Sequence, residues 1–187
     1  MADVAAAFAV VFLAELGDKT QLVALTLAGR YPAARVLTAL GAAIVVLQTL
    51  SVTAGAVVSE VVPDRAIAAG AGVLFLGFAV WTWRSAEALD DGELAGAARA
   101  GLLGVAAAFF LAELGDKTML TTAGLAADRG PVPVWIGSTA AMLAATVLAV
   151  VAGRSLMSRV SARTLRTVGA AAFAVVGSAT LIGAALG

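Results

Sequence analysis

The sequence FLAELGDKT occupies residues 12–20 and recurs without a change at residues 110–118. Each copy lies within a long apolar run and carries two carboxylates and one ammonium group. On insertion scales, a charged side chain at the centre of a membrane helix costs about 2.5–3.5 kcal/mol. Six such groups in two equivalent places therefore indicate a working polar site inside a membrane. They are Glu15, Asp18, Lys19, Glu113, Asp116 and Lys117.

The composition of the chain is that of an integral membrane protein. Of its 187 residues, 61% are hydrophobic and only 13% are charged, and its mean hydropathy is +1.01. A soluble domain of this length cannot bury so much apolar surface. The formal net charge is zero, which gives no reason to expect a nucleic-acid partner. Cysteine and histidine are both absent, so any bound metal must take oxygen ligands.

Six apolar runs have about the 18–25 residues that a helix needs to cross a bilayer. They cover residues 4–28, 33–59, 66–83, 102–126, 134–152 and 165–186. All four prolines fall between these runs, where a missing N–H does not interrupt a helix. The first run lacks the basic flank of a signal peptide, so we expect it to be retained. The sequence predicts an all-α integral membrane protein with six transmembrane helices.

The arginines predict how the chain is oriented. Eight arginines lie in the connections after the first, third and fifth runs or within the first three residues of the run that follows. The connections after the second and fourth runs hold one each, and the two tails hold none. By the positive-inside rule, the arginine-rich connections face the cytoplasm and both termini lie outside it.

An offset of 98 residues relates the two motif copies, and the same offset pairs Gly55 with Gly153. We therefore expect a first three-helix repeat at residues 1–86, an acidic cytoplasmic linker at residues 87–98 and a second three-helix repeat at residues 99–187. Because three is odd, the second repeat would enter the membrane from the opposite side. Inverted repeats of this kind commonly place a substrate site at the membrane midplane, between the two halves.

The spacing of the motif residues suggests a shared face. On an unbroken helix, positions i, i+3 and i+4 lie together, so Glu15, Asp18 and Lys19 would project to one side, as would their counterparts in the second copy. Gly17 and Gly115 lie between the acids. Glycine there could let a neighbouring helix approach closely or let the helix unwind, and the sequence leaves both roles open.

The two copies, if they face each other, would form a site for a divalent cation. Four carboxylates and two ammonium groups leave two negative charges, which one divalent ion would neutralise. Oxygen ligands suit Ca2+, Mn2+ and Mg2+ better than Cu(I) or Zn2+. Further oxygens are available from Thr20, Thr118 and Gln48, and the counterpart of Gln48 at the 98-residue offset is Thr146.

The empty site would carry protons, because carboxylates that are desolvated together favour the neutral form. Exchange of one divalent ion for two protons moves no net charge. It therefore avoids the free-energy cost of moving charge across the membrane potential, which is about 2.3 kcal/mol per elementary charge for each 100 mV. Lys19 and Lys117 would hold the acids in place.

The sequence ELGDKT at residues 15–20 and 113–118 resembles the signature E-x-G-D-[KR]-[ST] of the GDT family of cation/proton exchangers of bacterial, Golgi and chloroplast membranes. The resemblance covers essentially the whole chain. It implies a six-helix transporter that moves Ca2+ or Mn2+ out of the cytosol in exchange for protons. The implied metal ligands are Glu15, Asp18, Glu113 and Asp116, and the motifs are completed by Lys19, Thr20, Lys117 and Thr118. The chain departs from the family at Met119, where the first copy has Gln21, and this leaves the preferred metal open.

These features predict a multi-pass secondary antiporter in the plasma membrane of a prokaryote, with no permanently bound cofactor. Its partners would be the cation, protons and the lipid bilayer, and formation of a homo-oligomer is left open. One alternative is an exporter of a cationic solute such as a basic amino acid, because paired carboxylates would also hold an ammonium group. Another is a non-transporting intramembrane scaffold. An enzyme is least expected, because the chain has no histidine, nucleophile or cofactor motif.

Overall fold

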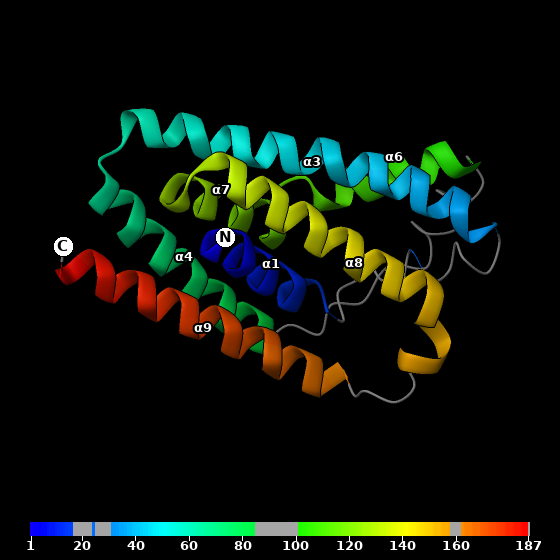
Figure 1. Cartoon of the computed structure of the whole chain (residues 1–187). Helices are drawn as coiled ribbons and strands as arrows, with labels where there is room; N and C mark the ends of the chain where they lie inside the picture. Colours follow the sequence, from blue (N-terminus) through cyan, green and yellow to red (C-terminus); the bar gives the residue numbers. More distant parts are fainter. Residues whose placement is uncertain (17–23, 25–30, 85–100, 158–161, 187) are drawn as a thin grey trace.

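The computed structural model describes residues 1–16, 24, 31–84, 101–157 and 162–186 of the chain, and within them every regular element is an α-helix. The helices are α1 (Ala2–Glu15), α3 (Ala33–Val61), α4 (Asp64–Arg84), α6 (Gly101–Glu113), α7 (Lys117–Arg129), α8 (Pro131–Met157) and α9 (Ala162–Leu186) (Figure 1). The prediction of an all-α protein is confirmed for this part of the chain.

Four helices are long and apolar enough to cross a membrane: α3, α4, most of α8 and most of α9. Large apolar side chains stand exposed along them, and Val46, Val73, Val151 and Val175 are each more than half exposed. Contact with lipid explains this exposure, which would be unfavourable in water. The integral membrane class is thereby confirmed, whereas the count of six spans and their inverted arrangement stay predictions.

The helix boundaries repeat at the offset found in the sequence. The matching boundaries are Glu15 with Glu113, Ala33 with Pro131, and Asp64 with Ala162. In Figure 1, α3 and α8 run in opposite directions, and so do α4 and α9. Two pairs of helices that match at this offset are therefore antiparallel within the described part of the chain.

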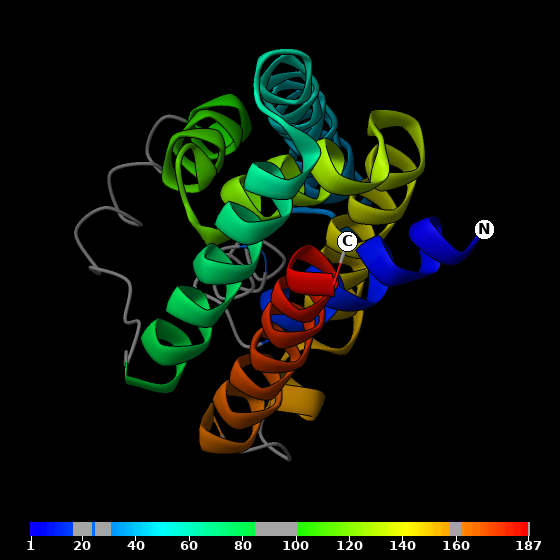
Figure 2. The same ribbon diagram turned by 90° about the vertical axis from the view of Figure 1, so that its left-hand side faces the viewer.

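The halves pack against each other through long helix pairs. Helix α4 lies along α9, and α1 lies along α8 (Figures 1 and 2). Glycine allows the first pair to approach closely, because a Cβ added at Gly177 would lie 2.9 Å from the carbonyl oxygen of Gly72. The rings of Phe75 and Phe173 stack in the same interface with centroids 6.4 Å apart. These two residues are related by the 98-residue offset, so the interface brings equivalent positions of the two halves together.

The fourth predicted span, residues 102–126, is not one continuous helix. Helix α6 ends at Glu113 and α7 begins at Lys117. Gly115, between them, has a φ of 84°, a conformation that glycine adopts without the steric penalty of a Cβ. The expectation that Glu113, Asp116 and Lys117 share the face of one helix is therefore wrong, because the helix unwinds between them. In the first half, α1 ends at Glu15, and most of the rest of that predicted span lies outside the described residues.

Candidate cation site

The second motif copy lies at the break between α6 and α7. Glu113 is the last residue of α6 and is fully buried. Asp116 occupies the N-cap position of α7, and Lys117, its first helical residue, is only 7% exposed. Broken helices in membranes offer free helix ends to ions, with carbonyl oxygens at the C-terminal end of one half-helix. The break thus places a buried carboxylate beside the carbonyl end of α6.

Gly115 allows the helix break because of its backbone conformation, a φ of 84°. A Cβ added there would meet no atom of the described residues within 4 Å, so Gly115 makes no close helix contact within that part of the chain. Of the two roles that the sequence left open, unwinding is the one found here. Gly17, the equivalent glycine, lies outside the described residues.

Two hydrogen bonds close the turn at the break. The backbone N–H of Asp116 donates to the carbonyl oxygen of Glu113 at 3.1 Å, and that of Gly115 donates to Sδ of Met119 at 3.2 Å. Met119 is the residue at which the second copy departs from the first. It therefore accepts a hydrogen bond from the unwound backbone, which the sequence alone did not indicate.

The first motif copy is described only at its start. Glu15 ends α1 and is 3% exposed, and Leu16 after it is extended. The predicted site residues Asp18, Lys19 and Thr20 lie outside the described residues.

The two motif copies meet in the interior of the bundle. Thr118 Oγ1, from the second copy, donates a hydrogen bond to Oε1 of Glu15, from the first. Thr118 is fully buried, and the two residues are 103 positions apart in the chain. The structure therefore joins a carboxylate of one copy to a hydroxyl of the other, away from solvent.

Gln48 lies at the level of the helix break. One apolar groove, of about 610 Å³, brings residues 39–46 of α3 against residues 102–110 of α6. Another, of about 410 Å³, brings residues 54–58 of α3 against residues 120–127 of α7. Helix α3 therefore runs parallel to α6 and α7, and its residues between the two grooves lie beside the break.

Two polar residues on one face of α3 at this level, Gln48 and Ser51, are fully buried. Ser51 Oγ donates to the carbonyl oxygen of Leu47 at 2.8 Å. The amide of Gln48 has no hydrogen-bond partner within the described part of the chain. Gln48 is therefore a buried amide at the level of the helix break, and its role at the site stays a prediction.

Thr146 occupies the equivalent place in the other half. A Cβ added at Gly137 of α8 would lie 2.4 Å from the carbonyl oxygen of Val4, near the start of α1. Helices α1 and α8 run in the same direction in Figure 1. Counted from the contact of Gly137 with Val4 at a rise of about 1.5 Å per residue, Thr146 of α8 therefore lies at about the level of Glu15 of α1. Its hydroxyl is 2.8 Å from the carbonyl oxygen of Met142, to which it donates.

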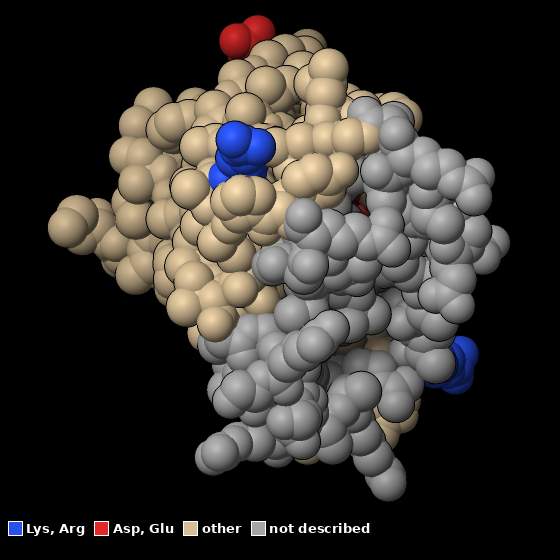
Figure 3. Space-filling model, turned by 90° about the vertical axis from the view of Figure 1, so that its right-hand side faces the viewer, with Lys and Arg blue, Asp and Glu red and all other residues tan. Residues whose placement is uncertain are grey.

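The predicted ligand set cannot be assembled from the described residues alone. Among them, no three acidic side chains form a group that could hold a metal ion. One predicted ligand, Asp18, lies outside them, so the assignment of Glu15, Asp18, Glu113 and Asp116 as ligands stays a prediction. Figure 3 looks onto the end of the bundle where α3 begins, and a small area of an acidic side chain is visible there below the surface.

Sequence reasoning missed a set of buried hydroxyls next to the motif. Thr121 and Thr122 of α7 and Ser138 of α8 are fully buried, and Thr139 is 6% exposed. The signal was present in the spacing, because polar residues recur on one helical face of α7 from Thr118 onward.

Comparison with known proteins gives consistent matches over nearly the whole chain. A family model described as "Divalent cation/proton antiporter GDT1" matches residues 3–90 and 101–187. A Vibrio cholerae protein named "Putative manganese exporter" is 32% identical, over 96% of this chain and 90% of that protein. GDT1-like protein 5 of Arabidopsis thaliana is 29% identical, over 93% of this chain and 92% of that protein. GDT1-like protein 3 of the same plant is also 29% identical, and the match covers 89% of this chain and 66% of that relative. No solved structure matches the chain.

Proposed function

Because the chain belongs to the GDT1 family of divalent cation/proton antiporters, we propose that it exports Mn2+ or Ca2+ from the cytosol in exchange for protons. The single observation that carries this proposal is the buried hydrogen bond between Thr118 and Glu15, which joins the two copies of the motif. The name of the Vibrio cholerae relative favours Mn2+ as the first ion to test.

The cation would bind between the two motif copies. Its carboxylate ligands would be Glu15, Asp18, Glu113 and Asp116. Supporting residues would be Lys19, Thr20, Gln48, Lys117 and Thr118. The burial of Glu15 and Glu113 supports this assignment, because a carboxylate that cannot reach water is stabilised by a cation or by a proton. The unwound backbone after α6 could supply carbonyl oxygens as further ligands.

Exchange follows from competition for the same oxygens. A divalent ion and two protons balance the same two negative charges, so either can fill the site, whereas an empty and fully ionised site is unfavourable away from water. Because the site cannot return empty and ionised, it must carry protons inward after it has released the ion outside. The outward movement of the ion is thereby coupled to the inward movement of protons.

We propose further that the chain has six spans in two inverted three-helix repeats, at residues 1–86 and 99–187, and that one half rocks against the other. The helix boundaries at the 98-residue offset and the opposite directions of α3 and α8 support this arrangement. Both termini would lie outside the cytoplasm, in the plasma membrane of a prokaryote.

Transport by the purified protein in lipid vesicles tests the function. Vesicles with an acidic interior should take up Mn2+ or Ca2+ and release protons, followed with an ion indicator inside and a pH indicator outside. Glu113→Gln should abolish the exchange, because it removes a ligand and a proton carrier together. Glu60→Gln, at an exposed acid near the end of α3, is the matched control and should exchange normally.

Two results would contradict the proposal. Exchange at the wild-type rate by Glu113→Gln would remove the site assignment. Export of lysine that Mn2+ does not inhibit would favour a transporter of basic solutes.

A further inference from the structure

Three threonine hydroxyls are buried without a hydrogen-bond partner in the part of the chain that the structure describes. They belong to Thr121 and Thr122 of α7 and to Thr139 of α8. Buried polar groups in proteins are nearly always hydrogen-bonded, to protein or to water, so three such hydroxyls close to a polar site need a physical reason.

A partner is readily available to a threonine within a helix. Its hydroxyl can donate to the carbonyl oxygen one turn earlier. Thr49 does so to Val45 at 2.8 Å, and Thr53 to Thr49 at 2.7 Å. Thr121, Thr122 and Thr139 do not use this solution, although they are buried and lie in helices. Their hydroxyls therefore stay available to a mobile partner such as water or a hydrated ion.

The three hydroxyls continue the cation site along α7 and α8. Thr121 and Thr122 lie three and four positions after Thr118, which donates to Glu15, so Thr118, Thr121 and Thr122 share one face of α7. Thr122 precedes Gly130 by eight residues, and Thr139 follows it by nine. Since Gly130 joins α7 directly to α8, residues at similar distances from it lie at one level. Thr122 and Thr139 thus lie about one turn beyond Thr118, in the direction of Gly130.

An apolar layer closes this polar column at its far end. Leu125 and Ala126 occupy the next turn on the same face of α7, and each is 1% exposed. Val134 of α8, four residues after Gly130, is fully buried in the same hydrophobic cluster. Beyond this layer, Arg129 lies 3.5 Å from Asp3, and their ion pair ties the end of α7 to the start of α1.

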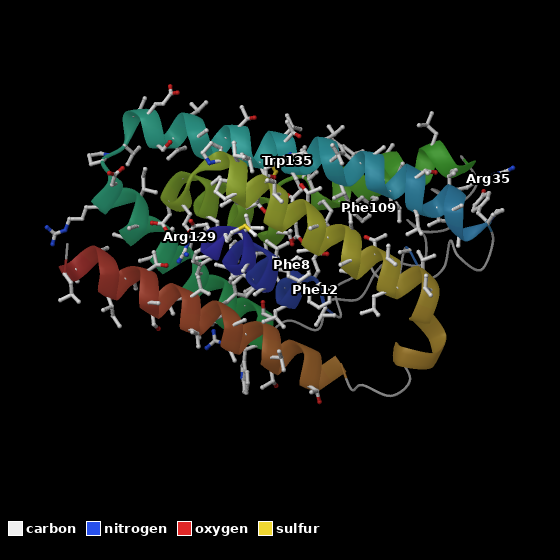
Figure 4. The ribbon with its side chains drawn as sticks, in the orientation of Figure 1. Phe8, Phe12, Arg35, Phe109, Arg129 and Trp135 are labelled. Carbon is white, nitrogen blue, oxygen red and sulfur yellow. The ribbon has the colours of Figure 1, made fainter. Side chains whose placement is uncertain are left out.

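Figure 4 shows the two ends of the bundle. Arg129 lies near the start of α1, and Arg35 lies at the opposite end. The arginine distribution in the sequence predicts that the Arg35 end faces the cytoplasm and that the Arg129 end faces outward. The polar column therefore leads from the carboxylates toward the side to which an exporter would release its ion.

We propose that Thr121, Thr122 and Thr139 line the exit path of the transported cation, and that the layer of Leu125, Ala126 and Val134 closes this path in the conformation seen here. The identity of the ion rests on the proposed function. Hydroxyls suit such a path because they replace part of a hydration shell without the charge that would trap a divalent ion. When the layer opens, the ion would pass from carboxylates to hydroxyls and then to water.

The chain has no cysteine, so single cysteines can be introduced into the full-length protein without other changes. Thr122→Cys and Thr139→Cys, in vesicles during Mn2+ exchange, should react with a membrane-impermeant cationic methanethiosulfonate added on the Arg129 side. Ala141→Cys is the matched control, because Ala141 is fully buried on α8 among apolar neighbours. We expect the two threonine positions to react at least about tenfold faster than the control, and the modification to stop exchange. Equal reaction of all three variants, with exchange intact, would overturn the proposal.

A second pair of variants keeps the proposal testable if the cysteine variants fold poorly. Thr122→Val preserves the shape of the side chain and removes the hydroxyl, whereas Thr122→Ser keeps the hydroxyl. Thr122→Val should lower the Mn2+ exchange rate about tenfold with little change in equilibrium Mn2+ affinity or melting temperature, and Thr122→Ser should be near normal. A wild-type rate for Thr122→Val would overturn the proposal. A wild-type protein that exchanges no divalent cation would instead contradict the proposed function, whatever the labelling pattern.

Discussion

Thr118 donates a hydrogen bond to the carboxylate of Glu15 across 103 residues of sequence, and both side chains are buried. The two residues come from different copies of one motif, so the bond joins the two copies in the interior of the bundle. The contact therefore joins a predicted metal ligand of the first copy to a hydroxyl of the second.

Thr118→Val tests this contact. The variant keeps the shape of the side chain but leaves Glu15 without the hydroxyl, and hydrogen bonds to charged groups contribute about 1.5–3 kcal/mol. We expect a lower melting temperature and weaker Mn2+ binding, measured by thermal unfolding and by equilibrium titration of the purified protein. Thr38→Val is the control, since Thr38 is exposed and its hydroxyl donates to carbonyl oxygens of its own helix at 3.0 Å. Equal melting temperatures and Mn2+ affinities for the two variants would show that the contact has no role in solution.

Gly115→Ala tests whether the break needs a left-handed backbone. An added Cβ would meet no atom within 4 Å among the described residues, so the expected effect comes from the φ of 84°. For a residue with a Cβ, this conformation costs about 1–2 kcal/mol. The variant should melt earlier and exchange cations more slowly.

Gly77→Ala is the matched control for the backbone at Gly115. It lies within α4, and in the part of the chain that the structure describes an added Cβ there also meets no atom within 4 Å. Alanine is favoured over glycine inside a helix by about 1 kcal/mol, so this variant should be as stable as the wild type or more so. If both variants melt like the wild type, the break does not depend on glycine.

The sequence was sufficient to predict the helices that have simple boundaries. The apolar runs at residues 33–59 and 66–83 became α3 and α4 with ends shifted by at most two residues, because prolines and charges mark where each helix leaves the membrane. The motif copies were expected to meet, and Thr118 and Glu15 do so. The carboxylate ligand set is not tested, because part of the first copy lies outside the described residues.

The sequence was not sufficient to predict the break at Gly115. Hydropathy is averaged over about 19 residues, so three unwound residues inside an apolar run leave no trace in it. A glycine among acids is compatible with either packing or unwinding, and only the φ of 84° distinguishes the two. The buried threonines of α7 were missed for a related reason: their near-neutral hydropathy hides a polar face that becomes evident once the start of α7 is known.

The affinity for Mn2+ should depend steeply on pH. In the proposed exchange, protons and the cation compete for the same carboxylates, so the proton-loaded form would dominate at low pH and the cation-loaded form at high pH. If two protons leave for each ion bound, affinity rises by up to about a hundredfold per pH unit where both carboxylates are protonated. Equilibrium titrations at about pH 6 and about pH 8 measure this dependence. Equal affinity at the two values would mean that ion and proton do not share a site.

The contact between α4 and α9 offers a test of how the two halves are held together. A Cβ at Gly177 would lie 2.9 Å from the carbonyl oxygen of Gly72 and 3.0 Å from the backbone nitrogen of Leu76. Backbone atoms cannot move aside as a flexible side chain can, so Gly177→Ala must push the helices apart, and we expect overpacking to destabilise the protein by about 1–3 kcal/mol. Gly183→Ala, on the same helix, adds a Cβ with no described atom within 4 Å and should not lower stability. Thermal unfolding of both variants measures the difference. Equal melting temperatures would mean that α4 and α9 do not pack this closely in the membrane.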